Sequence, residues 1–316
     1  MTAVRSARYD IDGVLLLNKP RGLSSQQAVA QVKRLYAARK AGHTGTLDPM
    51  ADGLLPIGLG EATKFSQFVL DSDKGYLATL QLGATTTTGD AEGDILQESP
   101  VAVSVAGVGT VLRSLTGAQV QTPPMHSAVK VGGKPLYAYA RAGEVVERKA
   151  RDIRIDGIQL VDFKETILVI RVLCSKGTYI RVLAEDIGAA LGCGAHLVGL
   201  TRELAGPFEL ASAVSIVELE SMDMQQRMVR LLQPDIFASS LPRLELEPAA
   251  QRRISNGQVV ELPGTSPGLY RLYGVADVFM GIGEVVAGEL RARRLLNQLQ
   301  SLPSNPQGLS KPVVTG

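Results

Sequence analysis

The amino-acid sequence predicts an α+β protein with two domains, the second of them small and rich in β-strands. Strand-like and helix-like segments follow one another without the regular alternation of a doubly wound sheet. The length of 316 residues is enough for about two domains. PDIFASSLP at 234–242 interrupts the pattern with two prolines and small residues, so we expect a domain boundary there.

The N-terminal part carries signals for a strand, a helix and a second strand. Residues 14–17 are all apolar and predict a short buried strand. Ser24 followed by Gln27 predicts a helix that begins with a capping box. Its apolar stripe comprises Ala28, Val29, Val32, Leu35 and Tyr36. Residues 76–82 alternate and predict a strand with one face formed by Tyr76, Ala78, Leu80 and Leu82.

A β-branched run at 167–174 predicts a further strand, and a helix follows it. We expect Thr178 to cap this helix and Gly192 to end it. Its apolar stripe comprises Ile180, Leu183, Ala184, Ile187 and Leu191. Arg181 then falls in the first turn, where the helix dipole disfavours a cation, so we expect an anionic partner such as Asp48.

Beyond residue 242 the chain predicts a small β-rich domain, placed at 241–303. The strand-like runs cover 244–246, 258–262, 269–275 and 279–289, and Gly or Pro turns separate them. The polar and Pro-containing tail at 304–316 is expected to be disordered.

Composition excludes several classes of protein. Hydrophobic residues make up 45% of the chain and charged residues 20%, as in ordinary globular proteins. No apolar run approaches the roughly 20 residues of a membrane span, and the N-terminus lacks a signal-peptide core, so we expect a cytoplasmic protein. The two cysteines, Cys174 and Cys193, and the three histidines show no metal-ligand spacing, so we expect no metal.

The net charge of +2 speaks weakly against a large anionic partner, but the charge is unevenly distributed. Residues 1–40 contain eight basic and two acidic side chains, and residues 130–154 contain seven and three. Residues 43–98 contain nine acidic side chains and two basic ones. The two basic segments are either ordinary solvated faces or contacts for an anionic partner.

Residues 42–64, GHTGTLDPMADGLLPIGLGEATK, contain five glycines and two prolines and predict a loop that approaches a ligand closely. Asp48 precedes Pro49, a pair that commonly forms a helix N-cap and the first helical residue. A carboxylate in that place stays ionised, so Asp48 is either a structural cap or a nucleophile or general base. His43 is either a structural histidine, a ligand, a general base or an aromatic wedge.

Nucleotide-binding motifs do not fit. VGGKPL at 131–136 lacks the first glycine and the Ser/Thr of a phosphate loop, and GLGEAT at 58–63 lacks the third glycine of a dinucleotide loop. We therefore expect neither ATP nor NAD.

The core HTGTLDP resembles the catalytic-aspartate segment of the bacterial TruB-type tRNA pseudouridine synthases. Other segments resemble further motifs of that family, in the same order: VLLLNKPRGLSS at 14–25, GYLATLQLGATTTTGDAEGD at 75–94, TPPMHSAVKVGGKPLYAYARAGEVVERKAR at 122–151, CSKGTYIRVLAEDIG at 174–188 and GAHLVGLTRELAGPF at 194–208. The resemblance implies a catalytic domain over 1–238 with a mixed, largely antiparallel sheet flanked by helices. It also implies an RNA-contacting insertion at about 122–152 and a PUA-like RNA-binding domain at 241–303.

The resemblance also implies site residues. The family's nucleophile falls on Asp48, its base-contacting tyrosine on Tyr76, and the arginine that pairs with the carboxylate on Arg181. The histidine that fills the gap left by an extruded base falls on His43. Further substrate contacts fall on Tyr179, Leu200, Lys19, Lys64 and Asp90. The sequence departs from the family pattern at His126, in place of tyrosine, and at Asp52, in place of threonine, and near Arg202 the run TRELAGPF differs slightly from the usual basic run.

On this resemblance we expect isomerisation of uridine-55 in the T-loop of tRNA to pseudouridine. The base would flip out of its stack and Asp48 would attack C1′ or C6, with no cofactor. The expected partner is the tRNA T-arm, with neither membrane nor protein partner, and the chain is expected to be a monomer. Two rival hypotheses are a non-catalytic RNA-binding protein and an aspartate-dependent glycoside hydrolase, whose second carboxylate would be Asp52 or Glu61.

Overall fold

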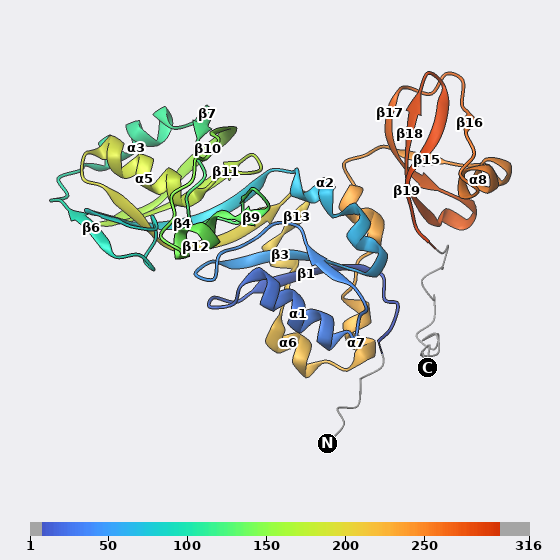
Figure 1. Ribbon diagram of the computed structural model, residues 1–316, viewed down its shortest axis with the longest axis horizontal. Helices are drawn as coiled ribbons and strands as arrows, with labels where there is room; N and C mark the ends of the chain where they lie inside the picture. Colours follow the sequence, from blue (N-terminus) through green and yellow to red (C-terminus); the bar gives the residue numbers. More distant parts are fainter. Residues whose placement is uncertain (1–7, 298–316) are drawn as a thin grey trace.

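The computed structural model describes residues 8–297, which form a large mixed sheet and a smaller C-terminal sheet (Figure 1). The large sheet has ten strands in the order β14-β1-β3-β12-β4-β11-β10-β7, with β13 beside β12 and β2 beside β3. The pairs β1–β14 and β3–β12 are parallel and the other pairs of this sheet are antiparallel. The expected α+β fold with a mixed, largely antiparallel sheet is confirmed.

The strands of the large sheet are β1 (Gly13–Lys19), β2 (Ala41–His43), β3 (Asp52–Leu59), β4 (Lys74–Leu82), β7 (Gly117–Gln121), β10 (Arg151–Lys164), β11 (Ile167–Cys174), β12 (Ala195–Ala205), β13 (Phe208–Glu209) and β14 (Val214–Ser215). Its helices are α1 (Ser25–Leu35), η1 (Gly60–Phe65), α2 (Ser66–Leu70), α3 (Val105–Ser114), α5 (Ile180–Leu191), η2 (Leu210–Ser212), α6 (Ile216–Ser221), α7 (Met224–Val229) and η3 (Pro234–Ala238). Two small hairpins project from it, β5 (Ala84–Thr86) with β6 (Ile95–Glu98), and β8 (Lys130–Val131) with β9 (Lys134–Pro135), the latter followed by α4 (Leu136–Arg141).

Local sequence signals place the helices that frame the sheet. The predicted capping box of Ser24 and Gln27 is present at the start of α1, and the apolar stripe of this helix is largely buried. The second predicted helix is α5, but Thr178 is not its cap. The Thr178 hydroxyl donates to the carbonyl of Ser175 in the preceding turn, and Tyr179 occupies the N-cap position without a side-chain bond.

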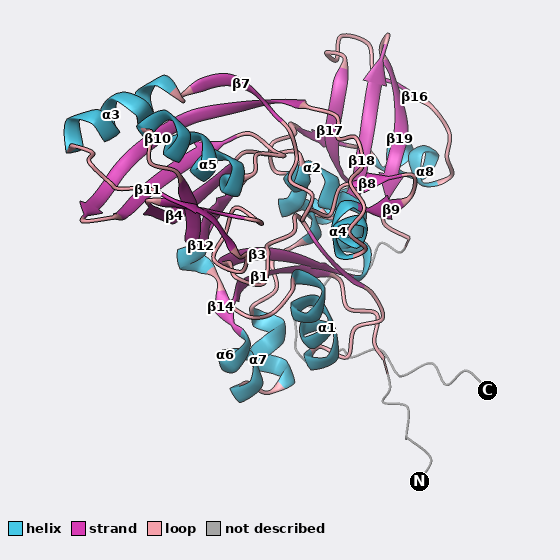
Figure 2. Cartoon of the chain, turned by 60° about the vertical axis from the view of Figure 1, so that its left-hand side comes forward, coloured by secondary structure: helices cyan, strands magenta, loops and turns pink. Residues whose placement is uncertain are grey.

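Two of the apolar cores on the large sheet meet at its central strands. One lies between β4, β10 and β11 and the helices α3 and α5, and the other lies between the strands β1 and β3 and the helices α1 and α6 (Figure 2). Tyr76 on β4 and Leu200 on β12 are partly buried and pack against both cores. A site formed by these two side chains would therefore be supported by both cores, at the middle of the sheet.

The C-terminal sheet has five strands in the order β15-β17-β18-β19-β16. They are β15 (Arg243–Glu245), β16 (Val260–Glu261), β17 (Gly268–Tyr273), β18 (Phe279–Val286) and β19 (Glu289–Leu295), with α8 (Pro248–Ser255) and η4 (Val275–Asp277) beside them. The single run predicted at 279–289 is wrong in extent, because a turn with positive φ at Ala287 and Gly288 splits it into β18 and the start of β19. The tail predicted at 304–316 lies outside the described residues.

The C-terminal sheet packs on the part of the chain that contains the large sheet, through aromatic side chains. Phe65 of η1 and Phe279 of β18 meet edge to face with ring centroids 5.2 Å apart, and Tyr273 packs against Phe279. Beside them the Lys64 ammonium, paired with Glu61, also donates to the carbonyl of Leu295 on β19. Between residues 8 and 297, no helix combines the length and the apolar character that crossing a membrane requires.

Candidate active site

Asp48 lies in a tight turn between β2 and β3, not at the start of a helix. The Ala51 amide donates to the Asp48 carbonyl at 3.1 Å, and β3 begins immediately afterwards at Asp52. The prediction of a helix N-cap at Asp48 is therefore wrong, because this turn feeds directly into a strand. A helix dipole does not stabilise the carboxylate, and its ionisation depends on side chains brought from elsewhere.

The first helix holds this turn in place. The Leu47 amide donates to the Ser25 hydroxyl at 2.7 Å, and that hydroxyl donates to the Leu47 carbonyl at 2.9 Å. The Arg21 side chain donates to the carbonyl of Met50, and the Gly22 amide donates to that of Pro49. Residues 19–25 thus anchor the loop at 44–51, which we call the aspartate loop, on both sides of Asp48.

Arg181 joins two carboxylates in the centre of the site. It comes from the first turn of α5, and its side chain is 5% exposed. One guanidinium nitrogen lies 3.0 Å from Asp48 Oδ2 and the other lies 3.4 Å from Asp90 Oδ2. The guanidinium also donates to the carbonyls of Thr88 and His126. The anionic partner predicted for this cation is therefore present, together with a second one.

The pKa of Asp48 is raised above its ordinary value, chiefly because its surroundings are desolvated. The Arg181 guanidinium acts in the opposite direction and lowers this pKa, whereas the neighbouring Asp90 carboxylate raises it. The expectation that a helix terminus keeps Asp48 ionised is thus replaced by a balance between desolvation and two opposing charges. The Asp48 side chain itself stays 39% exposed, so the carboxylate is accessible from solvent.

Tyr76 and Leu200 lie close to one another on adjacent central strands. In the β4–β12 register Leu200 is paired with Ala78, and Arg202 is paired with Tyr76. Burial raises the pKa of the Tyr76 hydroxyl, and the adjacent Arg202 guanidinium lowers it. An aromatic ring and an aliphatic side chain beside a carboxylate suit the two faces of a planar base.

His43 and Lys19 complete the surroundings of the aspartate loop. His43, on β2, accepts a hydrogen bond from the Gly45 amide at Nδ1, and burial lowers the pKa of its imidazole. Both the hydrogen bond to Nδ1 and the burial favour the uncharged imidazole. Lys19 is fully buried and donates to the carbonyls of Pro20 and Leu23, and its burial lowers its pKa to about 8.

Of the remaining residues predicted to contact the substrate, Tyr179 and Asp90 lie near Arg181, whereas Lys64 does not. The backbone of Tyr179 both donates to and accepts from the Gln121 amide group, which fixes it at the N-terminus of α5. Asp90 is 3% exposed and lies behind Arg181, with the Thr88 hydroxyl on its free oxygen. Lys64 is not brought into this cluster, because its ammonium is bound to Glu61, Leu295 and Asn297.

One departure from the family pattern, His126, lies beside Arg181. His126 contacts Arg181 through its backbone carbonyl at 2.7 Å, so this contact is independent of the side chain. The sequence indicated only a departure from the family pattern near Arg202 and did not place this residue in the site, whereas the structure places it fully buried beside Tyr76. The signal was available, because the period of two along a strand places Arg202 on the same face as Leu200.

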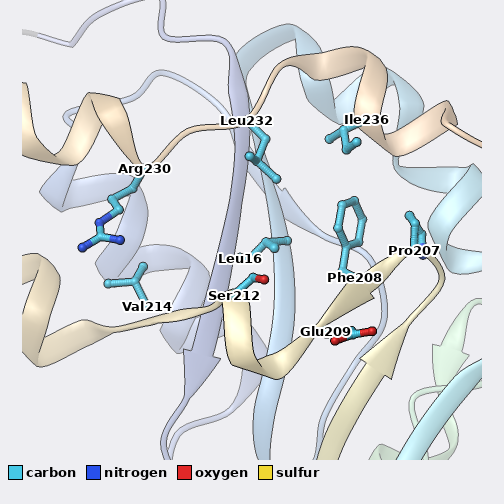
Figure 3. A pocket seen from close by; sticks show the side chains of 9 residues that line it. All are labelled: Leu16, Pro207, Phe208, Glu209, Ser212, Val214, Arg230, Leu232 and Ile236. Atoms are coloured by element: carbon cyan, nitrogen blue, oxygen red, sulfur yellow. The ribbon is translucent and has the colours of Figure 1, made fainter.

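A separate cavity of about 300 Å³ lies away from these residues (Figure 3). Its lining is formed by residues of β1, β13 and β14 and of the segment before and within η3: Leu16, Pro207, Phe208, Glu209, Ser212, Val214, Arg230, Leu232 and Ile236. None of the predicted site residues contributes to it. The candidate site is instead the open, polar cluster around Asp48.

The fold and the site define the class of protein. A family model described as "TruB family pseudouridylate synthase (N terminal domain)" matches residues 33–180, which include Asp48 and Tyr76. Two C-terminal models of the same enzymes match residues 181–235 and 242–296. The protein is thus a pseudouridylate synthase.

The relatives identify the family. The chain is 50% identical over 296 residues to the tRNA pseudouridine synthase B of Methylobacillus flagellatus, covering 93% of this chain and 98% of the relative. It is 48% identical to that of Burkholderia mallei, covering 92% and 96%. The chain belongs to the TruB family of pseudouridylate synthases.

The fold is also similar to solved structures. A chain of "Crystal Structure of a Cbf5-Nop10-Gar1 Complex" superposes with a TM-score of 0.66 and 26% identity, covering 87% of this chain and 78% of that one. A chain of an H/ACA RNP bound to a substrate RNA containing 2′-deoxyuridine, 23% identical over 90% of this chain and 84% of that one, has a TM-score of 0.68 and shares the fold.

Proposed function

We propose that the chain isomerises uridine-55 in the T-loop of tRNA to pseudouridine, with Asp48 as the nucleophile and without a cofactor. The observation that carries this proposal is the pairing of the accessible Asp48 carboxylate with the buried Arg181 guanidinium at 3.0 Å. The reaction breaks the N1–C1′ bond, rotates the base and rejoins it through C5, with no net oxidation. We propose that the enzyme acts as a cytoplasmic monomer.

The pairing with Arg181 orients the nucleophile. Because the ion pair engages Asp48 Oδ2, the other carboxylate oxygen is left to attack C1′ or C6 of the uridine. The guanidinium also favours the ionised form of a carboxylate that desolvation would otherwise protonate. Asp90 in turn holds the second arm of Arg181, so we assign Asp90 a positioning role behind the nucleophile rather than a contact with the base.

The aromatic residues suit an extruded base. A uridine that leaves the T-loop loses a few kcal/mol of stacking, and a side chain that fills the gap offsets part of this cost. The neutral ring of His43 is adapted to that place, because an uncharged imidazole enters a base stack without the desolvation of an imidazolium. Tyr76 and Leu200 would contact the flipped base, and the Tyr76 oxygen would accept the C5 proton as a phenolate, after its own proton has passed to water.

Two regions outside the site fit an RNA partner. The insertion at 122–152 carries basic and aromatic residues together, with the Lys134 ammonium 4.2 Å from the centroid of the Tyr139 ring. It projects as the β8–β9 hairpin and α4, and the exposed Tyr137 lies on α4. We propose that this insertion binds the T-arm, and that the C-terminal sheet, within the domain placed at 241–303, binds a more distant part of the tRNA.

The proposal is tested with tRNA transcripts that contain [5-³H]uridine. Pseudouridine formation at position 55 releases tritium, so we expect release from the wild-type transcript and none from a transcript with cytidine at position 55. Release of free base or sugar would instead indicate a hydrolase. Binding without release would leave a non-catalytic RNA-binding protein, and equal release from both transcripts would contradict the site specificity.

A further inference from the structure

Arg202 is a buried cation without a carboxylate partner. It lies near the end of β12, and it is 1% exposed. Within the described part of the chain, residues 8–297, no carboxylate oxygen lies within 4.0 Å of its guanidinium. A fully buried charge is costly unless its partners compensate for the lost hydration, and arginine is rarely fully buried without an acid. The groups that surround Arg202 therefore indicate what it does.

Its first partners belong to the segment that carries the nucleophile. Arg202 Nε donates to the carbonyl of Leu54 at 2.7 Å, and one terminal nitrogen donates to the carbonyl of Gly45 at 3.2 Å. Leu54 is on β3, directly after the Asp48 turn, and Gly45 lies between His43 and Asp48. The guanidinium thus spans the aspartate loop from one side to the other and connects both of its ends to β12.

Its remaining partner is Tyr76. The two residues are directly opposite in the antiparallel β4–β12 pair, so their side chains lie on the same face of the sheet. The guanidinium of Arg202 lies beside the Tyr76 hydroxyl and lowers the pKa of that hydroxyl. A guanidinium in this place stabilises negative charge on the Tyr76 oxygen.

We propose that Arg202 is a positioning residue that fixes the Tyr76 hydroxyl and the His43–Asp48 loop relative to one another. This proposal rests on the proposed function, in which Tyr76 and Asp48 act on the same uridine. One buried guanidinium with donors in a rigid plane holds both groups, whereas a flexible ammonium cannot keep the same geometry. Its cost in desolvation is then offset by the alignment of two reacting groups.

The test compares Arg202→Met and Arg202→Lys with Arg171→Met, all in the full chain. Arg171 lies on β11, is itself exposed and pairs with the half-buried Glu203, so this control removes an arginine from the opposite face of the sheet. We expect Arg202→Met to slow single-turnover tritium release by about tenfold to a hundredfold, as expected when a proton-transfer group is misaligned. Arg202→Lys should restore only part of the rate, and the dissociation constant for tRNA should change less than about threefold.

A double-mutant cycle with Tyr76→Phe separates this role from a purely structural one. If Arg202 acts partly through the Tyr76 hydroxyl, the loss caused by Arg202→Met is smaller in the Tyr76→Phe background than in the wild type. Thermal melting is measured alongside, so that unfolded variants are recognised, and Arg202→Lys provides a second variant that keeps the buried charge. Additive losses, or a rate for both Arg202 variants equal to that of Arg171→Met, would overturn the proposal. Absence of tritium release from the wild type would instead overturn the proposed function.

Discussion

The guanidinium of Arg181 lies 3.0 Å from the carboxylate of Asp48, although the two residues come from a helix and a loop that are far apart in the sequence. The same guanidinium reaches Asp90 at 3.4 Å, so one buried cation serves two acids. One positive charge balances only one of the two carboxylates. Asp90 is stabilised in addition by hydrogen bonds from the Thr88 hydroxyl and the Glu92 amide. This arrangement determines how readily Asp48 ionises, and the first two predictions depend on it.

Asp48→Asn is expected to abolish isomerisation while tRNA binding is retained. The amide has the same shape as the carboxylate but is not nucleophilic. Tritium release measures the reaction, and filter binding measures the affinity for tRNA. Glu92→Gln, at an exposed position in the 75–94 segment, is the control and should keep the wild-type rate. Substantial turnover by Asp48→Asn would contradict the assignment of the nucleophile.

Arg181→Gln and Asp90→Asn are expected to shift the pH dependence of the rate in opposite directions. The reaction needs ionised Asp48, so the rate falls as the pH falls through the pKa of this residue. Arg181 lowers that pKa and Asp90 raises it. Removing Arg181 therefore moves the acid limb of the single-turnover profile to higher pH, and removing the Asp90 charge moves it to lower pH. Both variants should be slower at every pH because the nucleophile is less well oriented. Shifts in the same direction would rule out this electrostatic account.

Tyr76→Phe is expected to bind tRNA normally but to form pseudouridine more slowly. The ring still packs between the two cores, whereas the phenolate oxygen that we propose as the acceptor of the C5 proton is lost. A positioned proton acceptor contributes about 10²-fold to 10⁴-fold to a rate. Single-turnover kinetics with saturating enzyme report the chemical step directly. An unchanged rate would remove the hydroxyl from the mechanism.

Lys74→Met is expected to flatten the increase of stability at alkaline pH. The Lys74 ammonium is buried and donates to the carbonyls of Val69, Leu70 and Ser72, and burial lowers its pKa to about 8. In the unfolded chain its pKa returns to 10.5. Between these values the unfolded chain binds more protons at this group than the folded one, so Lys74 contributes a rise of the free energy of unfolding with pH. Cys174, whose pKa burial raises to about 12, contributes a fall in part of the same window in the wild type and the variant alike.

Urea unfolding measured from neutral pH to about pH 10.5 tests this prediction. Lys19 contributes a rise in the same window because its pKa is also lowered to about 8, so the Lys74→Met variant should keep part of the slope. The exposed Lys149→Met variant should keep all of it. A slope equal to that of the wild type in Lys74→Met would contradict the prediction.

Gly188→Ala is expected to destabilise the protein by about 1–3 kcal/mol, the usual cost of overpacking. Gly188 lies on α5, where an added Cβ would lie 2.3 Å from the carbonyl carbon of Gly194 and closer still to the Ala195 amide. Both neighbours are backbone atoms that cannot rotate away. Gly157→Ala on β10 is the matched control, because nothing lies within 4 Å of its added Cβ. Equal unfolding free energies for the two variants would show that α5 shifts without cost.

Much of the fold follows from local patterns in the sequence. The capping box at Ser24, the alternating run that became β4 and the β-branched run that became β11 are each specified by neighbouring residues. The motifs from residue 14 to 208 also predict the pseudouridylate synthase family, which the relatives confirm. Where the local signal was ambiguous, the prediction was wrong. The Asp48–Pro49 pair is compatible with either a helix start or a turn. The apolar run at 279–289 is compatible with either one strand or two.

The sequence by itself determined the helices α1 and α5 and the strands β4 and β11 near the site, the family, and which residue types are available for chemistry. Only the tertiary structure decided that Arg181 bridges Asp48 and Asp90, that desolvation raises the pKa of Asp48, and that Arg202 lies against Tyr76 without a carboxylate. The physical reason is that charge pairing and desolvation depend on distances across the sheet. Those distances arise when β12 pairs with β4 and α5 packs on the core, and residues adjacent in the sequence do not specify them.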